Sequence, residues 1–238
     1  MTFRNPVSAL AGVALALLIC PSSAQAQRDD APPPPRPVSA QDKLVYADFE
    51  QKGPAVSARG GSVSLVKYQE SDLQQTTVKG APDGNTPDVV RIKPDDPNHL
   101  AKVDFSIKAP NQFAGAGIEI KGQPDADGKT PFDDVTGYKK LTLQLYAKGA
   151  ETVRVELISR GYGVDLPAGY PQRLIKVQPG LNTYEIALKA LAQPTWVEIK
   201  QDPKKILAKL TAISITVVCD QCHPMDGMLI VDNVSFER

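Results

Sequence analysis

The sequence predicts an all-β protein, a two-sheet antiparallel β-sandwich of the jelly-roll type. The first reason is hydrophobic alternation, since aliphatic and polar residues take turns along 141–145, 153–157 and 213–217. Such a pattern buries one face of a strand and leaves the other in water, as in antiparallel sheets. The second reason is that 21 prolines and 17 glycines interrupt the chain, too many for a helical bundle.

Residues 1–26 are expected to be a signal peptide. Arg4 gives a positive start, residues 9–19 form an apolar stretch, and Ala24-Gln25-Ala26 is a small-residue cleavage site. A membrane-spanning helix needs about 20 apolar residues, so we expect no membrane span in the mature chain. The sequence thus predicts an exported protein, periplasmic or extracellular, whose mature chain begins at Gln27.

A proline-rich segment, residues 27–41, follows the predicted signal peptide. Its four consecutive prolines favour extended polyproline II backbone, which has no internal hydrogen bonds. We therefore expect a disordered linker there. The remaining residues, 42–238, are enough for one β-sandwich domain with a sizeable core.

Within this domain we expect about ten short strands and almost no helix. Beyond the three clearest segments, strands are predicted at 43–50, 61–68, 87–93, 100–108, 113–121, 170–177, 181–188 and 228–237. Turn signals separate them, among them Pro82-Asp83-Gly84-Asn85, Asp125-Ala126-Asp127-Gly128 and Pro179-Gly180. Only 203–209 has a helical pattern, with Pro203 in its first turn.

The charges and motifs argue against several classes of function. Lys and Arg number 27 and Asp and Glu also number 27, so the chain lacks the positive field of a nucleic-acid binder. Two histidines, His99 and His223, leave little material for histidine-based catalysis. Motifs for a nucleophilic serine, a phosphate loop or a zinc protease do not occur, and Asp133 beside Asp134 is commonplace in such a chain. We expect a protein without enzymatic activity.

Four segments follow one another as in a known group of β-sandwiches. They are LVYADFE at 44–50, GAGI at 115–118 with VTGYKKLTL at 135–143, NTYEIAL at 182–188, and MLIVDNVSF at 228–236. In this order they resemble jelly-roll carbohydrate-binding modules and galactose-binding-like domains. They are also similar to the complex I intermediate-associated protein family. The resemblance covers nearly all of 42–238 and implies the same sandwich, whereas a ligand does not follow from the fold alone.

Asp232 carries the prediction of a metal site. It has the same strand parity as Ile230, Val234 and Phe236, which would turn its carboxylate towards the core. A buried carboxylate is costly unless it is paired, protonated or bound to a cation. The resemblance implies a structural Ca²⁺ held by Glu50 and Asp232 together with backbone carbonyls. The alternatives are a bulge that turns Asp232 outwards, or a bridge to Lys or Arg.

The Cys-x-x-Cys-His motif at Cys219, Cys222 and His223 has two interpretations. It matches the attachment pattern of c-type haem. However, it joins two strands, little chain follows it, and Met225 is too near His223 to reach the other side of an iron. In an oxidising compartment the two thiols are expected to form a disulfide that fixes the loop. Haem binding, metal binding and free thiols remain the alternatives.

A sugar site needs aromatic faces for the apolar side of a pyranose and polar groups for its hydroxyls. The candidates are outward residues of central strands, tyrosines of a glycine-rich loop and one tryptophan: Tyr146, Arg154, Glu156, Tyr162, Tyr170 and Trp196. The sequence thus predicts an exported, non-catalytic module that holds a glycan or cell-envelope polysaccharide on an open sheet face or in a loop groove. The alternative is a protein-interaction or assembly factor on the same sandwich, without a sugar site.

Overall fold

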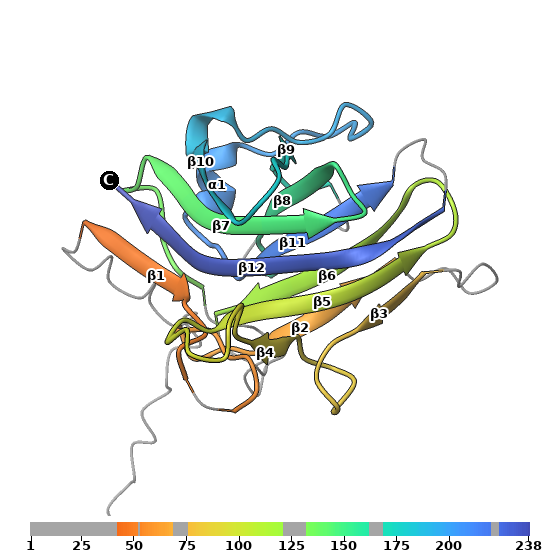
Figure 1. The fold of residues 1–238 in the computed structure, drawn as a ribbon. Coiled ribbons are helices and arrows are strands. Elements are labelled where there is room, and N and C mark those ends of the chain that lie inside the picture. The colour runs from red at the N-terminus through yellow and green to blue at the C-terminus, as the bar shows by residue number, and fades with distance from the viewer. Residues whose placement is uncertain (1–41, 52, 69–75, 121–131, 162–168, 220–223) are drawn as a thin grey trace, which may run out of the picture. The chain divides into compact units, whose positions relative to one another are not determined.

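The computed structural model describes residues 42–51, 53–68, 76–120, 132–161, 169–219 and 224–238. The predicted signal peptide, 1–26, and linker, 27–41, lie outside these residues. The described residues form two antiparallel sheets, with two short helical segments, η1 (Leu188–Ala190) and α1 (Pro203–Leu207) (Figure 1). None of the helices among them is long and apolar enough to cross a membrane.

The larger sheet has seven strands and the smaller has five. The larger runs in the order β10 (Asn182–Ala187), β7 (Lys140–Lys148), β12 (Met225–Glu237), β5 (Leu100–Ile107) and β3 (Thr77–Lys79). Two further strands pair with it, β1 (Lys43–Ala47) on β12 and β4 (Asp88–Val90) on β5. The smaller runs in the order β2 (Val63–Lys67), β6 (Gln112–Glu119), β11 (Ala212–Cys219), β8 (Thr152–Ile158) and β9 (Gln172–Lys176).

This arrangement confirms the predicted two-sheet sandwich. The three alternating segments are β7, β8 and β11, and their aliphatic side chains fill the space between the sheets. The predicted helix is present as α1, which Asp202 caps by accepting a hydrogen bond from the backbone N–H of Lys204 at 2.9 Å. Strand β3 was not predicted: it has three residues, too few for an alternating pattern, and no longer apolar stretch surrounds it as one surrounds β4.

The last strand departs from the predicted parity. Leu229 and Val231 point into the core, whereas Ile230 is half-buried on the outer side. The pairing of β12 with β7 then shifts register between Asp232 and Ser235, at a β-bulge where Asn233 has a φ of 50°. The bulge reverses the parity, so that residues 234 and 236 point inwards although residue 230 does not. The orientation of Asp232 was inferred from an inward-facing Ile230. That orientation of Ile230 was therefore wrong.

A buried ion pair fixes the chain near β1. Both nitrogens of the Arg59 guanidinium edge donate to the Asp133 carboxylate, at 2.8 and 2.9 Å, and the Tyr46 hydroxyl donates to it at 2.9 Å. Asp133 is only 2% exposed. Its hydrogen bonds raise the pKa of the Arg59 guanidinium above its ordinary value. Asp133 is therefore a structural residue that connects the segments before β2 and β7.

Candidate functional site

The outer side of the five-stranded sheet carries small, buried residues along the centre of its middle strands. At the centre of β6 and β11 the residues that point away from the core are small, namely Gly115, Gly117, Ser214 and Thr216, whereas Phe113 and Glu119 near the ends of β6 are larger. Thr216 is fully buried and Ser214 is 8% exposed although both point away from the core. Larger side chains on the neighbouring strands must therefore stand over these positions. Small residues of the two middle strands thus lie beneath larger side chains of their neighbours.

Two aromatic rings and a cation lie in a row on this side of the sheet. The Arg154 guanidinium on β8 lies over the ring of Phe113 on β6, 4.8 Å from its centroid. Tyr68 packs edge-on against Phe113, with 5.8 Å between the ring centroids. Thr216 lies opposite Arg154 in the strand register, so the row crosses β11. A cation held over an aromatic face keeps its planar group fixed.

Two polar groups in this row lack partners. Arg154 Nε and Thr216 Oγ1 are buried, and neither makes a hydrogen bond to a described residue. A buried donor without a partner costs about 1–3 kcal/mol. Both groups belong to side chains that point away from the core, so a ligand that displaced the side chains covering them would supply the missing acceptors. This is the strongest sign of a binding site in the described part of the chain.

Glu156 occupies the next outward position of β8. It lies opposite Ser214 in the register. Burial raises the pKa of its carboxyl group above the ordinary value, although Arg154 and a hydrogen bond from the backbone N–H of Tyr170 act in the opposite direction. A desolvated carboxyl group beside a cation is a strong hydrogen-bond partner for a hydroxyl.

Tyr170 and Trp196 lie together beyond Glu156. Tyr170 is 5% exposed and packs with Ile158 and Ala212 in a small apolar cluster. Gly169 precedes it with a φ of 76°, and a Cβ there would lie 2.9 Å from the Trp196 ring. Only glycine lets the two segments approach so closely. Trp196 itself is 66% exposed, so its ring is available for stacking.

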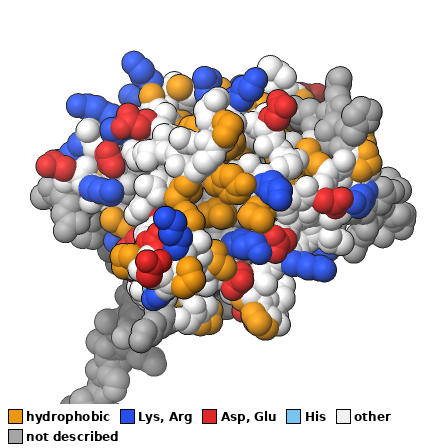
Figure 2. Space-filling model, in the orientation of Figure 1, with side chains coloured by type: hydrophobic (Ala, Val, Ile, Leu, Met, Phe, Trp, Pro, Cys, Tyr) orange, Lys and Arg blue, Asp and Glu red, His pale blue; other side chains and the backbone are white. Residues whose placement is uncertain are grey.

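The structure divides the predicted ligand residues between two surfaces. Arg154 and Glu156 share the outer side of the five-stranded sheet, with Tyr170 bonded to Glu156. Tyr146 belongs to β7 and pairs with Ile230 on the outer side of the other sheet. Figure 2 shows hydrophobic side chains gathered over β7 and β12 there, bordered by basic and acidic ones. Tyr162 lies outside the described residues.

Phe113 and Tyr68 were not predicted. The outward parity of Phe113 against Ala114, Ala116 and Ile118 was a usable signal, because those neighbours all point into the core. The contact with Arg154 depends on strands that are distant in sequence, and no local pattern shows it.

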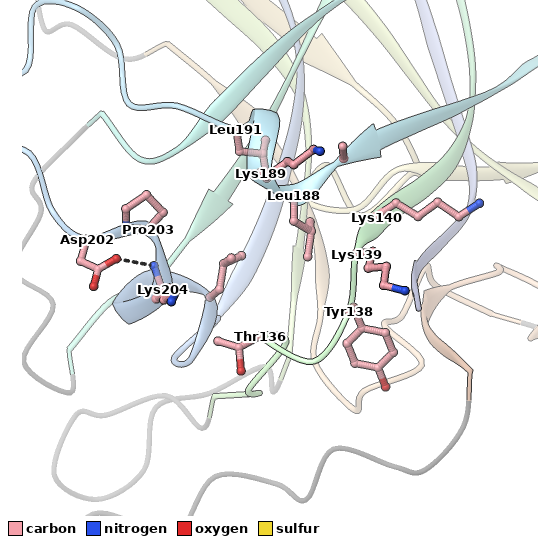
Figure 3. Close-up of a pocket in the computed structure, with 12 residues that line it drawn as sticks. Thr136, Tyr138, Lys139, Lys140, Leu188, Lys189, Leu191, Asp202, Pro203 and Lys204 are labelled. Atoms are coloured by element: carbon pink, nitrogen blue, oxygen red, sulfur yellow. Dashed lines mark hydrogen bonds between the residues drawn. The ribbon is translucent and has the colours of Figure 1, made fainter.

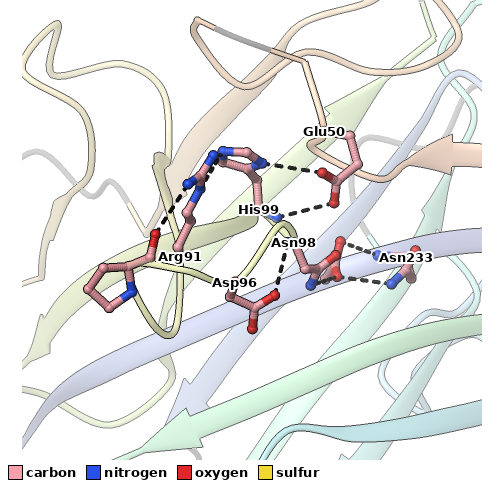
Figure 4. A network of polar contacts seen from close by, with 8 residues as sticks. Glu50, Arg91, Asp96, Asn98, His99 and Asn233 are labelled. Atoms are coloured by element: carbon pink, nitrogen blue, oxygen red, sulfur yellow. Dashed lines mark hydrogen bonds and ion pairs between the residues drawn. The ribbon is translucent and has the colours of Figure 1, made fainter.

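The two predicted metal ligands lie in a connected polar network (Figure 4). Asp232 is fully buried and accepts hydrogen bonds from the Asn98 side chain at 3.0 Å and from the backbone and side chain of Asn233 at 2.8 and 2.9 Å. Glu50 accepts from the backbone N–H of His99 at 3.1 Å and contacts the ring nitrogen Nδ1 at 3.2 Å.

Burial raises the pKa of Asp232 to about 6. The negative charges of Glu50 and Asp48 raise it further, whereas the hydrogen bonds from Asn98 and Asn233 lower it. The predicted alternative of a bridge to Lys or Arg is not what holds Asp232, since its partners are asparagine amides. This end of the sheet therefore has a negative potential that a cation would relieve.

The chemistry of these residues fits a hard cation, because carboxylates and asparagine side chains supply oxygen ligands. In the described residues, however, no group of three acidic, histidine or cysteine side chains is close enough to hold an ion together. Backbone carbonyls and asparagine oxygens would have to complete the shell. Calcium binding by Glu50 and Asp232 therefore stays a prediction.

The predicted disulfide also stays a prediction. Cys219 is buried at the end of β11, and Cys222 and His223 lie outside the described residues. If the two thiols are joined, the intact mass of the purified protein will be about two hydrogens below that of the reduced protein. Equal masses before and after reduction would contradict the disulfide. A covalently attached haem, the alternative, would give the purified protein a strong visible absorption band.

No protein-family model and no curated protein matches the sequence. Among solved structures, the chain is similar to a family 11 carbohydrate-binding module of the cellulosomal cellulase Lic26A-Cel5E of Clostridium thermocellum, with a TM-score of 0.52, 12% identity, and coverage of 82% of this chain and 94% of that chain. It is also similar to a family 30 carbohydrate-binding module, with a TM-score of 0.51, 11% identity, and coverage of 81% and 98%. At these identities the likeness shows the fold, the jelly-roll β-sandwich of such modules.

Proposed function

We propose that the protein binds a glycan on the outer side of its five-stranded sheet and has no enzymatic activity. The observation that carries this proposal is the pair of buried, unpartnered donors, Arg154 Nε and Thr216 Oγ1, beside the small residues of the two middle strands. The fold it shares with carbohydrate-binding modules supports the same conclusion. A sugar hydroxyl can accept from both groups and donate to the Glu156 carboxyl group.

The aromatic contribution comes from the corner beside Glu156. Trp196 is exposed, so a pyranose can stack on its ring. Tyr170, which follows Gly169 at the Trp196 ring, is buried and positions Glu156 through its backbone N–H. Phe113 is covered by the Arg154 guanidinium and holds that group in place. One exposed ring beside a cation and a carboxyl group suits a single soluble polysaccharide chain.

Export and calcium complete the proposal. The N-terminal pattern directs the protein to the periplasm or the outside of the cell, where its ligand would be an extracellular or cell-envelope polysaccharide. A Ca²⁺ ion beside Glu50 and Asp232 would neutralise the carboxylates that gather at the bulge of β12. Its role would be structural, because Asp232 lies on β12 of the other sheet and Glu50 follows β1, which pairs with β12.

Affinity electrophoresis in gels with soluble polysaccharides tests the glycan site. We expect retardation by at least one of mixed-linkage β-glucan, xyloglucan, glucomannan and xylan. Arg154→Met keeps the contact with Phe113 but removes the donors, and it should weaken binding about tenfold or more, since a lost buried hydrogen bond costs about 1–3 kcal/mol. Glu156→Gln should weaken binding without unfolding the protein, because burial already disfavours the charged form.

Tyr146→Ala is the matched control. Tyr146 lies on the outer side of the other sheet, so its removal should leave retardation unchanged. If Tyr146→Ala abolishes binding while Arg154→Met does not, the site is on the seven-stranded sheet and our assignment is wrong.

A protein-interaction role has one observation in its favour. Ile199 is 76% exposed, close in sequence to the exposed Trp196, and exposed apolar side chains of this size are typical of interfaces. A pull-down from periplasmic extract with the wild type and with Ile199→Ser separates the two functions. A stable protein partner that Ile199→Ser loses, together with no retardation by any polysaccharide, would favour the assembly factor.

A further inference from the structure

A large pocket opens where β7 begins and β10 ends. It has a volume of about 1090 Å³ and is lined by parts of the segments 136–140, 187–191 and 202–207 (Figure 3). It shares no lining residue with the proposed glycan site. Small-molecule sites in proteins usually measure about 300–1,000 Å³, so this pocket has room for a ligand of considerable size.

The walls of the pocket are apolar and continuous with the core. Leu188 and Leu191 are each 5% exposed and belong to the core between the sheets. Leu207 on α1 is half-buried and packs against the same core. In Figure 3 the labelled Leu188 lies between the α1 side and the Tyr138 side of the pocket. A hydrocarbon chain lying there would remove apolar surface from water, which contributes about 25 cal/mol per Å².

The rim of the pocket is positively charged. Lys139, Lys189 and Lys204 are exposed, and none of them forms an ion pair with a described residue. Lys140 differs, because Glu185 and Glu237 hold its ammonium group at 2.6 and 3.3 Å.

Asp202 does not offset this charge by pairing with a lysine ammonium group. It is the sole acidic residue among the described residues that line the pocket. Its carboxylate accepts a hydrogen bond from the backbone N–H of Lys204, drawn as the dashed line in Figure 3. Three ammonium groups therefore surround an apolar opening.

We propose that this pocket binds a single-chain amphiphile with a carboxylate head, such as a fatty acid. The hydrocarbon chain lies between Leu188, Leu191 and Leu207, and the carboxylate lies among the rim lysines. Opposite charge attracts this head group and disfavours a cationic one. The inference does not depend on the proposed glycan binding.

Calorimetric titration of the full chain with dodecanoate, below its micelle concentration, tests the head group and the chain together. We expect saturable binding of one dodecanoate per protein, and at least about tenfold weaker binding of dodecyltrimethylammonium and of dodecyl maltoside. Absence of saturation, or equal affinity for all three amphiphiles, would overturn the proposal.

Charge reversal locates the binding. The double variant Lys189→Glu/Lys204→Glu changes two exposed side chains, so the fold should be retained, and dodecanoate affinity should fall about five- to tenfold, since each exposed ionic contact contributes up to about 1 kcal/mol. Lys79→Glu/Lys93→Glu is the matched control, because both residues are exposed and Lys79 lies on β3, at the opposite end of the sheet from β10. If both double variants lose the same dodecanoate affinity, the loss comes from the change in net charge and not from this pocket. That result would overturn the proposed site.

The same variants keep this proposal separate from the glycan proposal. Polysaccharide retardation should be unchanged in Lys189→Glu/Lys204→Glu, and dodecanoate binding should be unchanged in Arg154→Met. Either proposal can therefore be contradicted by these measurements while the other one stands.

Discussion

Replacing Arg59 with methionine is expected to lower the free energy of unfolding by about 3 kcal/mol, because the Asp133 carboxylate would stay buried without its counter-charge. The two side chains make paired hydrogen bonds at 2.8 and 2.9 Å, and Asp133 is 2% exposed. The Tyr46 hydroxyl would remain as a partner, but it supplies no charge. Urea unfolding of the wild type and the variant measures the difference.

Two further variants make the result interpretable. Lys43→Met removes an exposed pair, in which 3.7 Å separates the ammonium group from Glu237, and should change stability by less than about 1 kcal/mol. The double variant Arg59→Met/Asp133→Asn also removes the unpaired buried charge of Asp133. It should therefore regain part of the lost free energy of unfolding. If Arg59→Met costs no more than Lys43→Met, the buried pair does not hold this part of the fold.

The second large effect is a fall in stability with rising pH in metal-free buffer. The carboxyl group of Asp232 has a pKa of about 6 in the folded protein, against 3.8 for an ordinary aspartate. The folded state therefore binds the proton more tightly than the unfolded state does. The stabilisation is complete below about pH 4 and is lost as the pH rises through about 6, with a total of about 2–3 kcal/mol.

Asp232→Asn should remove this dependence. Other carboxyl groups also titrate, so the quantity to measure is the difference in unfolding free energy between wild type and Asp232→Asn from pH 4 to pH 8. Asp226→Asn, on the same strand, is the control: its exposed carboxylate binds Lys108, which lowers its pKa, so its contribution has the opposite sign and is small. A difference for Asp232→Asn that stays constant with pH would contradict the raised pKa.

Added calcium should reverse the pH effect. An ion bound only by the folded state stabilises it by mass action, and it favours the ionised form of Asp232. We expect millimolar Ca²⁺ to raise the melting temperature of the wild type at pH 7.5, and to do so much less in Asp232→Asn or Glu50→Gln. A melting temperature that is the same with Ca²⁺ and with a chelator would remove calcium from the proposal.

Most of the fold could be predicted because a strand that buries one face has an aliphatic residue at every second position. Leu141, Leu143 and Leu145 show it in β7. The bulge in β12 could be predicted only as an alternative, because it depends on the left-handed backbone of Asn233 and on loop residue Asn98 covering Asp232. A single extra residue reverses the parity of everything after it.

The candidate site shows the same division. Parity correctly placed Arg154 and Glu156 on the outer side of their strand. It could not tell that β7 and β8, although successive in the chain, belong to different sheets, which separates Tyr146 from them. The contact of Phe113 with Arg154 spans β11, a strand that comes much later in the sequence. Such cross-strand neighbours follow from sheet order, which alternation does not encode.

The position of β12 constrains when the protein can fold. It is the last strand in chain order, yet it lies between β5 and β7 and also carries β1. Until β12 has left the ribosome, β1, β5 and β7 lack the strand with which they form hydrogen bonds. The core also lacks the aliphatic side chains of β12. A nascent chain without β12 cannot complete the larger sheet, so we expect stable folding only after this strand has been synthesised.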